Sequence, residues 1–530
     1  LNSYIALAKL KNYVQRAGKN EAITTQLKED GVCVLVGPGG AGKSTLVAEY
    51  GHAQSNTQTV RWMIAETKEK LISNYEKLAN ELGMDTEALA KELAQKVDQY
   101  LSVLAKKVYQ ALQARDQQFL LILDNAEDAA IIKECLQDRP SSVQVLVTTR
   151  NKRDFSEYHP IELISFTKQE AKTYVEKSMS GKVNKPAATD IDLLIEAVGL
   201  NPKSLSLAVG YLQENRLVHV KGYVQKLEAL KQSGQQQKGK LVLPEARLGL
   251  ESLIDRLAPA QQIMQYGAYL DPDFIPIALL KALLAEEDEE NLGELIDALE
   301  RLSLVTLIEG KDDQELAIQI HREVQAACSN YTGFTSKLSK KALLENLVSL
   351  FNEHMPKLEE VVDSKKGQAK LYAPHVGYVL DKAKGILKES DILANLYDCM
   401  GKYHEYVTFN YFSVVPYYEQ ALVLRQQLHE GNHPDIGKSL HNLGYAYEYL
   451  LGDYGKAQGY LERALKIFEM HYGPDHPETG ITLTNLGNAY GDLGNYPKKK
   501  EVLERALKIK EFHYGPDHPE TGITLTNLGN

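Results

Sequence analysis

Short apolar runs alternate with helix-forming stretches over the first 155 residues. The runs lie at residues 31–36, 60–65, 119–123 and 143–148, and the stretches between them have helical periodicity. Short buried strands that alternate with helices are typical of a parallel sheet covered by helices. We therefore predict an α/β domain over residues 1–155.

After about residue 155 the β-type runs stop and helical periodicity continues. It leads to a Gln-, Gly- and Lys-rich tail within residues 225–240, and such a tail is typical of a linker. A small helical domain with its linker is therefore predicted over residues 156–240.

Two β-rich pieces follow the next set of helices, at residues 304–310 and 315–321. Helices followed by a β-hairpin fit a winged-helix domain, which we place at residues 241–330. The pattern from there on is helical, so residues 331–390 are predicted to form a helical connector.

Residues 391–530 are built from similar units. The eighteen residues HYGPDHPETGITLTNLGN occur at 471–488 and again at 513–530, where the chain stops inside a unit. The units align on three alanines, spaced by 43 and then 42 positions: Ala421, Ala464 and Ala506. Two helices and a connector with this period indicate a solenoid. Because a solenoid normally ends in a polar cap, we expect the array to be longer than this chain.

These units resemble tetratricopeptide repeats, in the 42-residue form found in kinesin light chains and many bacterial proteins. The resemblance implies a concave face that binds a protein or peptide. One asparagine recurs on the first helix of each unit: Asn442, Asn485 and Asn527. In similar repeats it bonds the backbone of a bound peptide, although an asparagine that braces the turn between helices fits equally well. Small residues are expected where two helices approach closely: Gly444, Ala446, Gly487 and Ala489.

The composition is that of a globular protein, with 43% apolar and 25% charged residues and a net charge of −11. A mainly electrostatic binder of nucleic acid or membranes would need a basic surface, so we expect neither. The sequence has no apolar run of membrane-spanning length and no secretion signal. We therefore expect a cytoplasmic protein, with reduced thiols at its four separated cysteines: Cys33, Cys135, Cys328 and Cys399. The start at Leu1 suggests a fragment or a processed product.

The segment GPGGAGKST carries the clearest chemistry. It follows a predicted strand, precedes a predicted helix and fits the pattern G-x-x-x-x-G-K-[ST]. The glycines let backbone N–H groups turn toward phosphates, and the N-terminus of the helix favours an anion. We expect Lys43 to reach the β- and γ-phosphates and the Ser44 hydroxyl to ligate Mg²⁺. The predicted nucleotide-binding residues are Gly37, Pro38, Gly39, Gly40, Ala41, Gly42, Lys43, Ser44 and Thr45.

Two other strands end in residues with matching chemistry. The apolar run at 119–123 ends at Asp124, which is placed to hold Mg²⁺ through water. Asn125 follows where many hydrolytic relatives carry a second acid, which leaves the rate of hydrolysis open. A third strand ends in Arg150, where an arginine can meet the γ-phosphate. The predicted catalytic residues are thus Lys43, Asp124 and Arg150, and the predicted Mg²⁺ ligands are Ser44 and Asp124.

The segment NKRD at 151–154 matches a guanine-specificity motif. A GTPase should also show D-x-x-G, whereas residues 124–127 read DNAE. We interpret the match as coincidence and expect ATP and ADP as the nucleotides.

The order of these segments resembles that of NB-ARC-type STAND ATPases, over about residues 10–330. The segment VGLNPKSLSLAVGYL at 198–212 resembles the family's G-L-P-L motif, with Asn201 inserted. The segment AIQIHREVQAAC at 317–328 resembles the family's winged-helix motif, with Ile-His-Arg in place of Met-His-Asp. The resemblance implies that Pro202 lies against adenine, that Arg150 is a sensor arginine, and that His321 touches the β-phosphate of ADP in a closed state.

Two other groups of polar residues have plainer interpretations. The acidic run AEEDEE at 285–290 is expected to be a solvated helix start. The connector HYGPDHP pairs histidines with an aspartate, but we expect its prolines to stiffen the chain, with Pro477 in the first turn of a helix, and no metal to bind there.

The predicted fold is multidomain: an α/β P-loop NTPase domain, a small helical domain, a winged-helix domain and an all-α tetratricopeptide solenoid. The function implied is a STAND-type signalling ATPase with slow hydrolysis, in which the repeats sense a protein or peptide and exchange of ADP for ATP with Mg²⁺ permits homo-oligomerisation. Two alternatives stay open: a peptide-binding scaffold with a structural nucleotide domain, and a STAND-type transcription regulator whose effector lies outside this chain.

Overall fold

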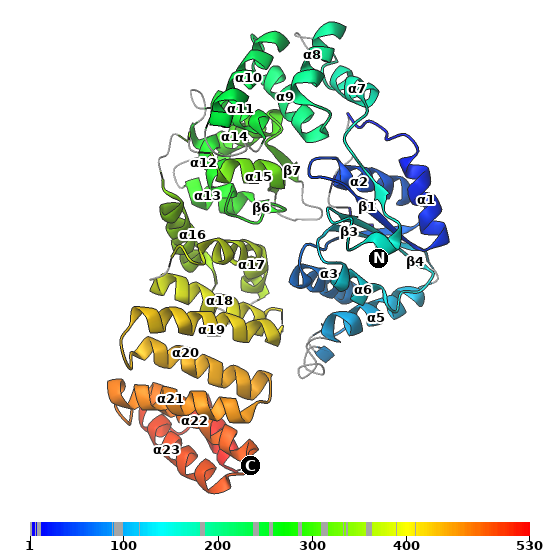
Figure 1. The fold of residues 1–530 in the computed structure, drawn as a ribbon. Coiled ribbons are helices and arrows are strands. Elements are labelled where there is room, and N and C mark those ends of the chain that lie inside the picture. The colour runs from blue at the N-terminus through cyan, green and yellow to red at the C-terminus, as the bar shows by residue number, and fades with distance from the viewer. Residues whose placement is uncertain are drawn as a thin grey trace. The chain divides into compact units, whose positions relative to one another are not determined.

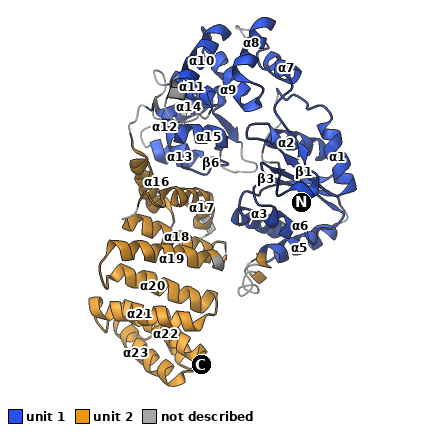
Figure 2. Ribbon diagram, viewed as in Figure 1, with its two compact units in different colours: residues 1–86, 101–337 blue, residues 87–100, 338–530 orange. Residues whose placement is uncertain are grey.

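The computed structural model places the chain in two compact units (Figure 2). Unit 1 comprises residues 1–86 and 101–337, and unit 2 comprises residues 87–100 and 338–530. The described residues are 3–5, 7, 12–86, 88–89, 99–115, 117–180, 186–236, 243–253, 258–284, 289–308, 316–331, 333–334, 338–356, 363–387, 390–408 and 410–529.

Unit 1 begins with a five-stranded parallel sheet in the order β2-β3-β4-β1-β5. The strands are β1 (Val32–Val36), β2 (Thr59–Ile64), β3 (Phe119–Ala126), β4 (Val143–Thr149) and β5 (Ile161–Glu162). The four predicted strands are confirmed. The expectation that strands stop near residue 155 is wrong, because β5 adds a fifth strand beside β1; its two residues are too few to give a sequence pattern.

Helices cover this sheet (Figure 1). They are α1 (Lys19–Glu29), α2 (Lys43–Gln54), α3 (Lys68–Glu81), α5 (Tyr100–Gln113) and α6 (Ala129–Leu136). Apolar side chains of α1 and α2, such as Ile23 and Val47, share one buried cluster with Leu35, Ile122 and Leu146 of the strands. Since successive side chains of a strand point to opposite faces, strands buried on both faces are continuously apolar, as β1 is.

Four helices follow the sheet and enclose a core of their own. They are α7 (Lys168–Ser178), α8 (Ala188–Val198), α9 (Pro202–Glu214) and α10 (Val220–Gln236). The predicted linker tail is in part helical, because α10 continues to Gln236; residues 237–240 lie outside the described residues.

The last part of unit 1 combines helices with a three-stranded antiparallel sheet in the order β6-β8-β7. Its elements are α11 (Pro244–Leu253), α12 (Ala258–Gly267), β6 (Ile275–Pro276), α13 (Ile277–Leu284), α14 (Glu289–Arg301), β7 (Val305–Ile308), β8 (Ala317–Ile320) and α15 (Arg322–Ser329). The predicted pairing of two β-rich pieces is confirmed by β7 and β8. The winged-helix assignment stays a prediction that this order of elements agrees with. Residues 285–288 of the acidic run lie outside the described residues.

The described part of unit 2 from residue 338 onward is helical, as predicted (Figure 1). Its helices are α16 (Lys340–His354), α17 (Asp363–Ala383), α18 (Asp391–Tyr406), α19 (Tyr411–Leu428), α20 (Pro434–Tyr445), α21 (Tyr454–Tyr472), α22 (Pro477–Asp492), α23 (Tyr496–Tyr514) and α24 (Pro519–Gly529). Pro477 opens α22, where its missing N–H costs no helical hydrogen bond. Ile523 and Leu525 of α24 are 49% and 46% exposed.

Close helix contacts in the repeats depend on the predicted small residues. A Cβ atom added to Gly444 would lie 2.5 Å from Leu461 Cγ, and one added to Gly487 would lie 2.6 Å from Leu503 Cγ. Ala446 is also fully buried. Close approach is therefore confirmed at Gly444 and Gly487.

One repeat contains an extra residue, and a helix absorbs it. The unit at 433–454 is one residue longer than the unit at 476–496, and its first helix continues past Tyr445 as a π-helical turn, Ala446–Leu450. A π turn takes in one more residue without breaking the helix. The packing of the two helices in this unit is therefore kept.

All four cysteines are free, and three of them are buried: Cys33, Cys135 and Cys328. Among the residues that the structure describes, no helix is both long enough and apolar enough to cross a membrane.

Candidate functional site

The P-loop connects β1 to α2 at the carboxyl edge of the parallel sheet. Gly40 and Gly42 adopt φ of +70° and +88°, a conformation that favours glycine because it has no Cβ atom. Lys43 begins α2, is only 7% exposed, and donates from Nζ to the carbonyl oxygens of Gly37 (2.8 Å) and Pro38 (3.0 Å). The loop thus folds around its own lysine, with the first turn of α2 directly behind it.

A cluster of side chains joins the first turn of α2 to the ends of β3 and β4. The Ser44 hydroxyl donates to Asp124 Oδ1 at 2.9 Å, and the Thr148 hydroxyl donates to the same oxygen. Thr148 also accepts from the backbone N–H of Asn125, whose φ is +60°. The two predicted Mg²⁺ ligands, Ser44 and Asp124, are therefore in direct contact, and Thr148 is a third oxygen that the sequence did not single out.

Burial and hydrogen bonds act in opposite directions on Asp124. Burial raises the pKa of this carboxyl group, while the hydrogen bonds from Thr148 and Ser44 lower it, and the net pKa is raised. A divalent cation would favour the ionised form, so the donor set fits Mg²⁺ in its chemistry: one carboxylate and two hydroxyl oxygens.

The start of α9 rests on the P-loop. Asn201 caps α9 by accepting from the backbone N–H groups of Lys203 (2.9 Å) and Ser204 (3.2 Å), and it donates from Nδ2 to the carbonyl of Gly39 at 3.1 Å. The backbone N–H of Lys203 donates to the carbonyl of Gly40 at 3.3 Å. Asn201, which interrupts the motif that the sequence resembles, is thus the residue that connects α9 to the loop.

The predicted contact residue Pro202 also lies at the P-loop. Its Cγ atom would be 4.0 Å from a Cβ atom built on Gly42. Arg150 follows β4, and its Cζ atom lies 3.3 Å from a Cβ atom built on Gly39. The structure therefore brings Arg150, Pro202 and the loop together. The contact of Pro202 with adenine and the sensor role of Arg150 stay predictions.

The start of α15 reaches the same loop. His321 caps α15, since its Nδ1 accepts from the backbone N–H of Glu323 at 3.3 Å. The Glu323 carboxylate covers two loop glycines: its Oε2 lies 2.9 Å from a Cβ atom built on Gly40, and its Oε1 overlaps one built on Gly39. Only glycine leaves room for this carboxylate. No signal in the sequence had pointed to Glu323.

Several basic side chains lie close together in this region, and their pKa values are lowered. Burial is the main cause that lowers the pKa of Lys43 to about 8, and Arg150 lowers it further, against Asp124 and Glu323. Burial likewise lowers the pKa of Lys203 to about 8, with Glu323 opposing. Burial and four nearby cations hold the pKa of His321 well below its usual range. A phosphate would reverse the shifts of Lys43 and Lys203, so the site fits an anion better than it fits water.

A partly buried ion-pair network holds α15 beside the sheet. Arg322 binds Glu66 through Nε (2.9 Å) and Nη2 (2.8 Å), and it binds Asp273 through Nη1 (2.7 Å) and Nη2 (2.8 Å). Glu66 follows β2, and Asp273 precedes β6. Lys70 bonds to Glu66, Asp271 and Asp273 from the other side. Arg322 takes the place of the aspartate in the motif that the sequence resembles, and its partners lie far away in the sequence.

The NKRD segment has a local role. Asn151 donates from Nδ2 to Asp154 Oδ2 at 2.6 Å and accepts from the Asp154 backbone N–H at 3.2 Å, which closes a turn after β4. Lys152 pairs with Glu162 of β5. These contacts occupy the side chains that a guanine base would need.

Two of the recurring asparagines of unit 2 bond to the preceding unit. Asn442 hydrogen-bonds to Asp398 of α18, and Asn485 lies 3.4 Å from His441 Nε2 of α20. Asn527 is half-buried on α24. Besides a peptide contact and a brace within one unit, a third role is therefore possible for this position: Asn442 and Asn485 connect the first helices of successive units.

Two parts of the chain match known family models. Residues 16–180 match the NB-ARC domain, and residues 393–470 and 448–511 match the tetratricopeptide repeat. No curated protein matches the chain. A match to a P-loop domain implies nucleotide binding, and tetratricopeptide repeats imply contact with another protein.

Solved structures that match the chain at low identity include two ATPases from Pyrococcus species. One is a signal transduction ATPase with numerous domains (STAND) that has a tetratricopeptide repeat sensor, from Pyrococcus horikoshii: 14% identity, TM-score 0.43, covering 99% of this chain and 81% of that one. The other is a Walker-type ATPase from Pyrococcus abyssi: 15% identity, TM-score 0.29, covering 60% of this chain and 95% of that one. Both TM-scores are below 0.5, so neither likeness bears on function.

Proposed function

Because residues 16–180 are an NB-ARC domain and residues 393–511 carry tetratricopeptide repeats, we propose that this chain is a STAND-type ATPase whose bound nucleotide controls signalling. ATP and ADP with Mg²⁺ are its nucleotides. The repeats bind a protein or peptide, and the ATP-bound form assembles with further copies of itself.

One observation carries this proposal: four segments far apart in sequence meet at the P-loop. Asp124 and Arg150 come from the ends of β3 and β4, Asn201 from the start of α9, and Glu323 from the start of α15. A nucleotide held by the loop would touch the α/β part, the helical part and the segment around α15. Its phosphates would therefore change contacts in all three.

The switch follows from the charges at the loop. A γ-phosphate adds negative charge next to Glu323, which already lies against Gly39 and Gly40, and next to Arg150 and Lys203. ADP and ATP would thus differ in their affinity for the arrangement in which α15 touches the loop. Only such a difference in affinity can shift the population of two states.

The first experiment asks whether the purified protein binds and responds to nucleotide. The intact chain is purified, its bound nucleotide is released and identified, and its mass in solution is measured with ADP and with ATP, each with Mg²⁺. We expect retained ADP and a higher mass with ATP. Absence of bound nucleotide, together with a mass that ATP does not change, would refute the proposal.

A pair of lysine variants separates the site from general effects. Lys43→Ala removes the lysine at the start of α2, whereas Lys68→Ala removes the lysine at the start of α3, which pairs with Glu134. We expect the first variant to lose nucleotide and the second to keep it. Equal retention by both variants would mean that the nucleotide is bound elsewhere.

A further inference from the structure

The connectors between repeat units share a stacked pair of rings. At the end of each connector, a histidine caps the next helix through Nδ1, which accepts a backbone N–H at 3.2–3.3 Å: His433, His476 and His518. An aromatic ring four residues earlier stacks on each of these histidines. In two connectors this ring is a tyrosine, Tyr472 or Tyr514, with ring centroids 4.5 and 4.9 Å apart.

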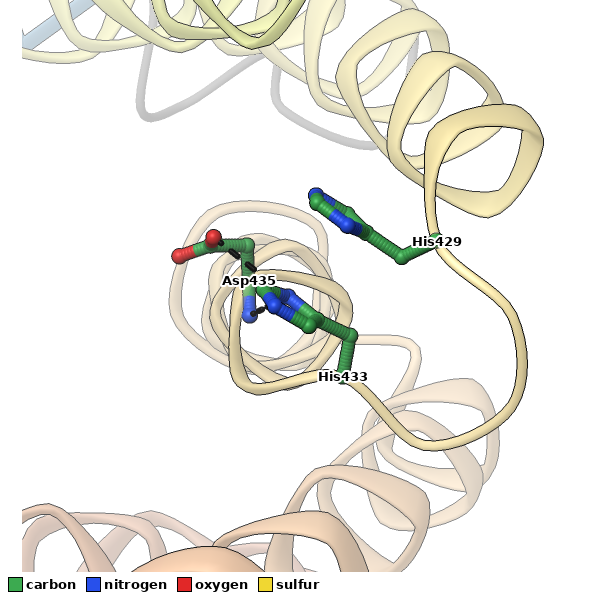
Figure 3. A group of neighbouring side chains, drawn as sticks. All are labelled: His429, His433 and Asp435. Atoms are coloured by element: carbon green, nitrogen blue, oxygen red, sulfur yellow. Dashed lines mark hydrogen bonds and ion pairs between the residues drawn. The ribbon is translucent and has the colours of Figure 1, made fainter.

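The connector between α19 and α20 differs, because its stacking residue is His429. The His429 and His433 rings are 3.7 Å apart and tilted by 6°. Asp435 lies beside them, with Oδ2 3.4 Å from His433 Nδ1 (Figure 3). Each of these three side chains offers one ligand atom, and the three atoms lie within 4.8 Å of one another. Among the residues that the structure describes, this is the one such group of three.

Hydrogen bonds leave the Nδ1 lone pair of His429 free and use the Nδ1 lone pair of His433. His429 Nε2 lies 3.1 Å from Asp391 Oδ1, so Nε2 carries the proton and Nδ1 is the nitrogen with the free lone pair. His433 Nδ1 accepts the Asp435 N–H at 3.3 Å, so its lone pair is held by the start of α20 and becomes available to an ion only when this long bond opens. A carboxylate on the far nitrogen of a histidine is the usual partner of a metal-binding imidazole, and Asp391 has that place.

We propose that His429, His433 and Asp435 bind a divalent transition-metal ion of the Zn²⁺ type. Two imidazoles and one carboxylate suit such an ion, which leaves a fourth position for water. The side chains are accessible: His429 is 20%, His433 38% and Asp435 32% exposed. Binding replaces the weak cap bond of His433 and the ion pair between Asp435 and Lys438 (3.0 Å), and it turns the two rings out of their parallel stack, because the lone pairs of an imidazole lie in the ring plane.

A bound ion would tie three helices together. Asp391 starts α18, His429 follows the last residue of α19, and His433 and Asp435 lie at the start of α20. The ion would therefore hold successive helices of the repeat array at one angle. This inference does not depend on the nucleotide site, which lies in unit 1.

The test is a Zn²⁺ titration of the intact, untagged chain without nucleotide, against a chromogenic chelator of known affinity. We expect one ion per chain at micromolar or tighter affinity. His429→Tyr installs the residue of the other two connectors, so it keeps the stacking and the fold but removes one ligand. We expect it to weaken binding at least tenfold.

Three other variants sharpen the result. Asp391→Asn removes the orienting carboxylate and should weaken Zn²⁺ binding about 10–100-fold. Lys438→Gln removes the competing ammonium and should tighten it. His513→Tyr makes the same exchange in the last connector and should leave the affinity unchanged. The proposal is overturned if the native chain binds no Zn²⁺ in this range, or if His429→Tyr binds as tightly as the native chain.

Discussion

Arg322 offers the sharpest test of how unit 1 is held together. Its guanidinium forms two-pronged hydrogen bonds with both Glu66 and Asp273, and the three side chains are only 20%, 17% and 14% exposed. Arg322→Met keeps most of the apolar length but leaves two carboxylates without their main partner. Removing one member of a buried ion pair typically costs about 3–5 kcal/mol.

The pKa of Glu66 gives a second figure for the same interaction. Burial on its own would raise this pKa, yet the hydrogen bonds and charge of Arg322, with Lys70, lower it from 4.5 to about 2. A shift of that size corresponds to roughly 3–4 kcal/mol at 1.4 kcal/mol per pH unit. Since the folded pKa is the lower one, this stability is present above pH 4.5 and is lost as the pH falls toward 2.

The assay uses the only tryptophan, Trp62, which is buried in β2 four residues before Glu66. Its fluorescence reports the unfolding of unit 1 in urea, without a signal from the repeats. We expect Arg322→Met to lower the free energy of unfolding of unit 1 by about 3–5 kcal/mol at pH 7. The loss should be smaller at pH 3, because Glu66 is then no longer ionised in the unfolded chain or in the variant.

Arg301→Met is the matched control. Arg301 pairs with Glu214, but its side chain is 54% exposed, and exposed ion pairs contribute about 0–1 kcal/mol. The reasoning is refuted if the two variants lose equal stability, or if the loss on Arg322→Met does not change between pH 7 and pH 3.

Two further predictions concern unit 2 and are measured by its thermal unfolding, followed by circular dichroism. Gly444→Ala places a Cβ atom 2.5 Å from Leu461 Cγ and should destabilise the repeats by about 1–2 kcal/mol, despite the better helix propensity of alanine. Gly459→Ala lies on an open helix surface and should stabilise the repeats by up to about 1 kcal/mol. The opposite order of stabilities would contradict the packing argument. Burial raises the pKa of Glu448 from 4.5 to about 9, so the native state loses stability as the pH rises through this interval. Glu448→Gln should therefore stabilise the repeats at pH 8 and have little effect on them at pH 4. A gain in stability that is the same at both pH values would show that the carboxyl group is not the cause.

The sequence predicted those features whose signals are local. The P-loop needs glycines, a lysine and a hydroxyl within nine residues, between a strand and a helix, and all of these conditions can be read from neighbouring positions. The repeats need only an apolar pattern that returns with a constant period. For this reason the strands β1 to β4, the start of α2 and the paired helices of unit 2 agree with the prediction.

Contacts between distant segments could not be predicted in the same way. Nothing near Glu323 in the sequence shows that its carboxylate lies on Gly39, and nothing near Arg322 shows that Glu66 is its partner. The His429–His433 stack is a similar case, because the equivalent position in the other connectors is a tyrosine with the same packing role. Such pairs form only when distant segments of the chain come together, and this is determined by the packing of the whole unit.

The sequence alone therefore determined the type of each element and the chemistry of the P-loop, because hydrogen bonds within helices and the preference of glycine for positive φ act over a few residues. Only the tertiary structure decided which residues surround that loop. In an interior with few water molecules, a charge from a residue far away in sequence, such as Glu323 or Arg322, interacts strongly with its neighbours. Burial is a property of the folded chain, not of any short segment.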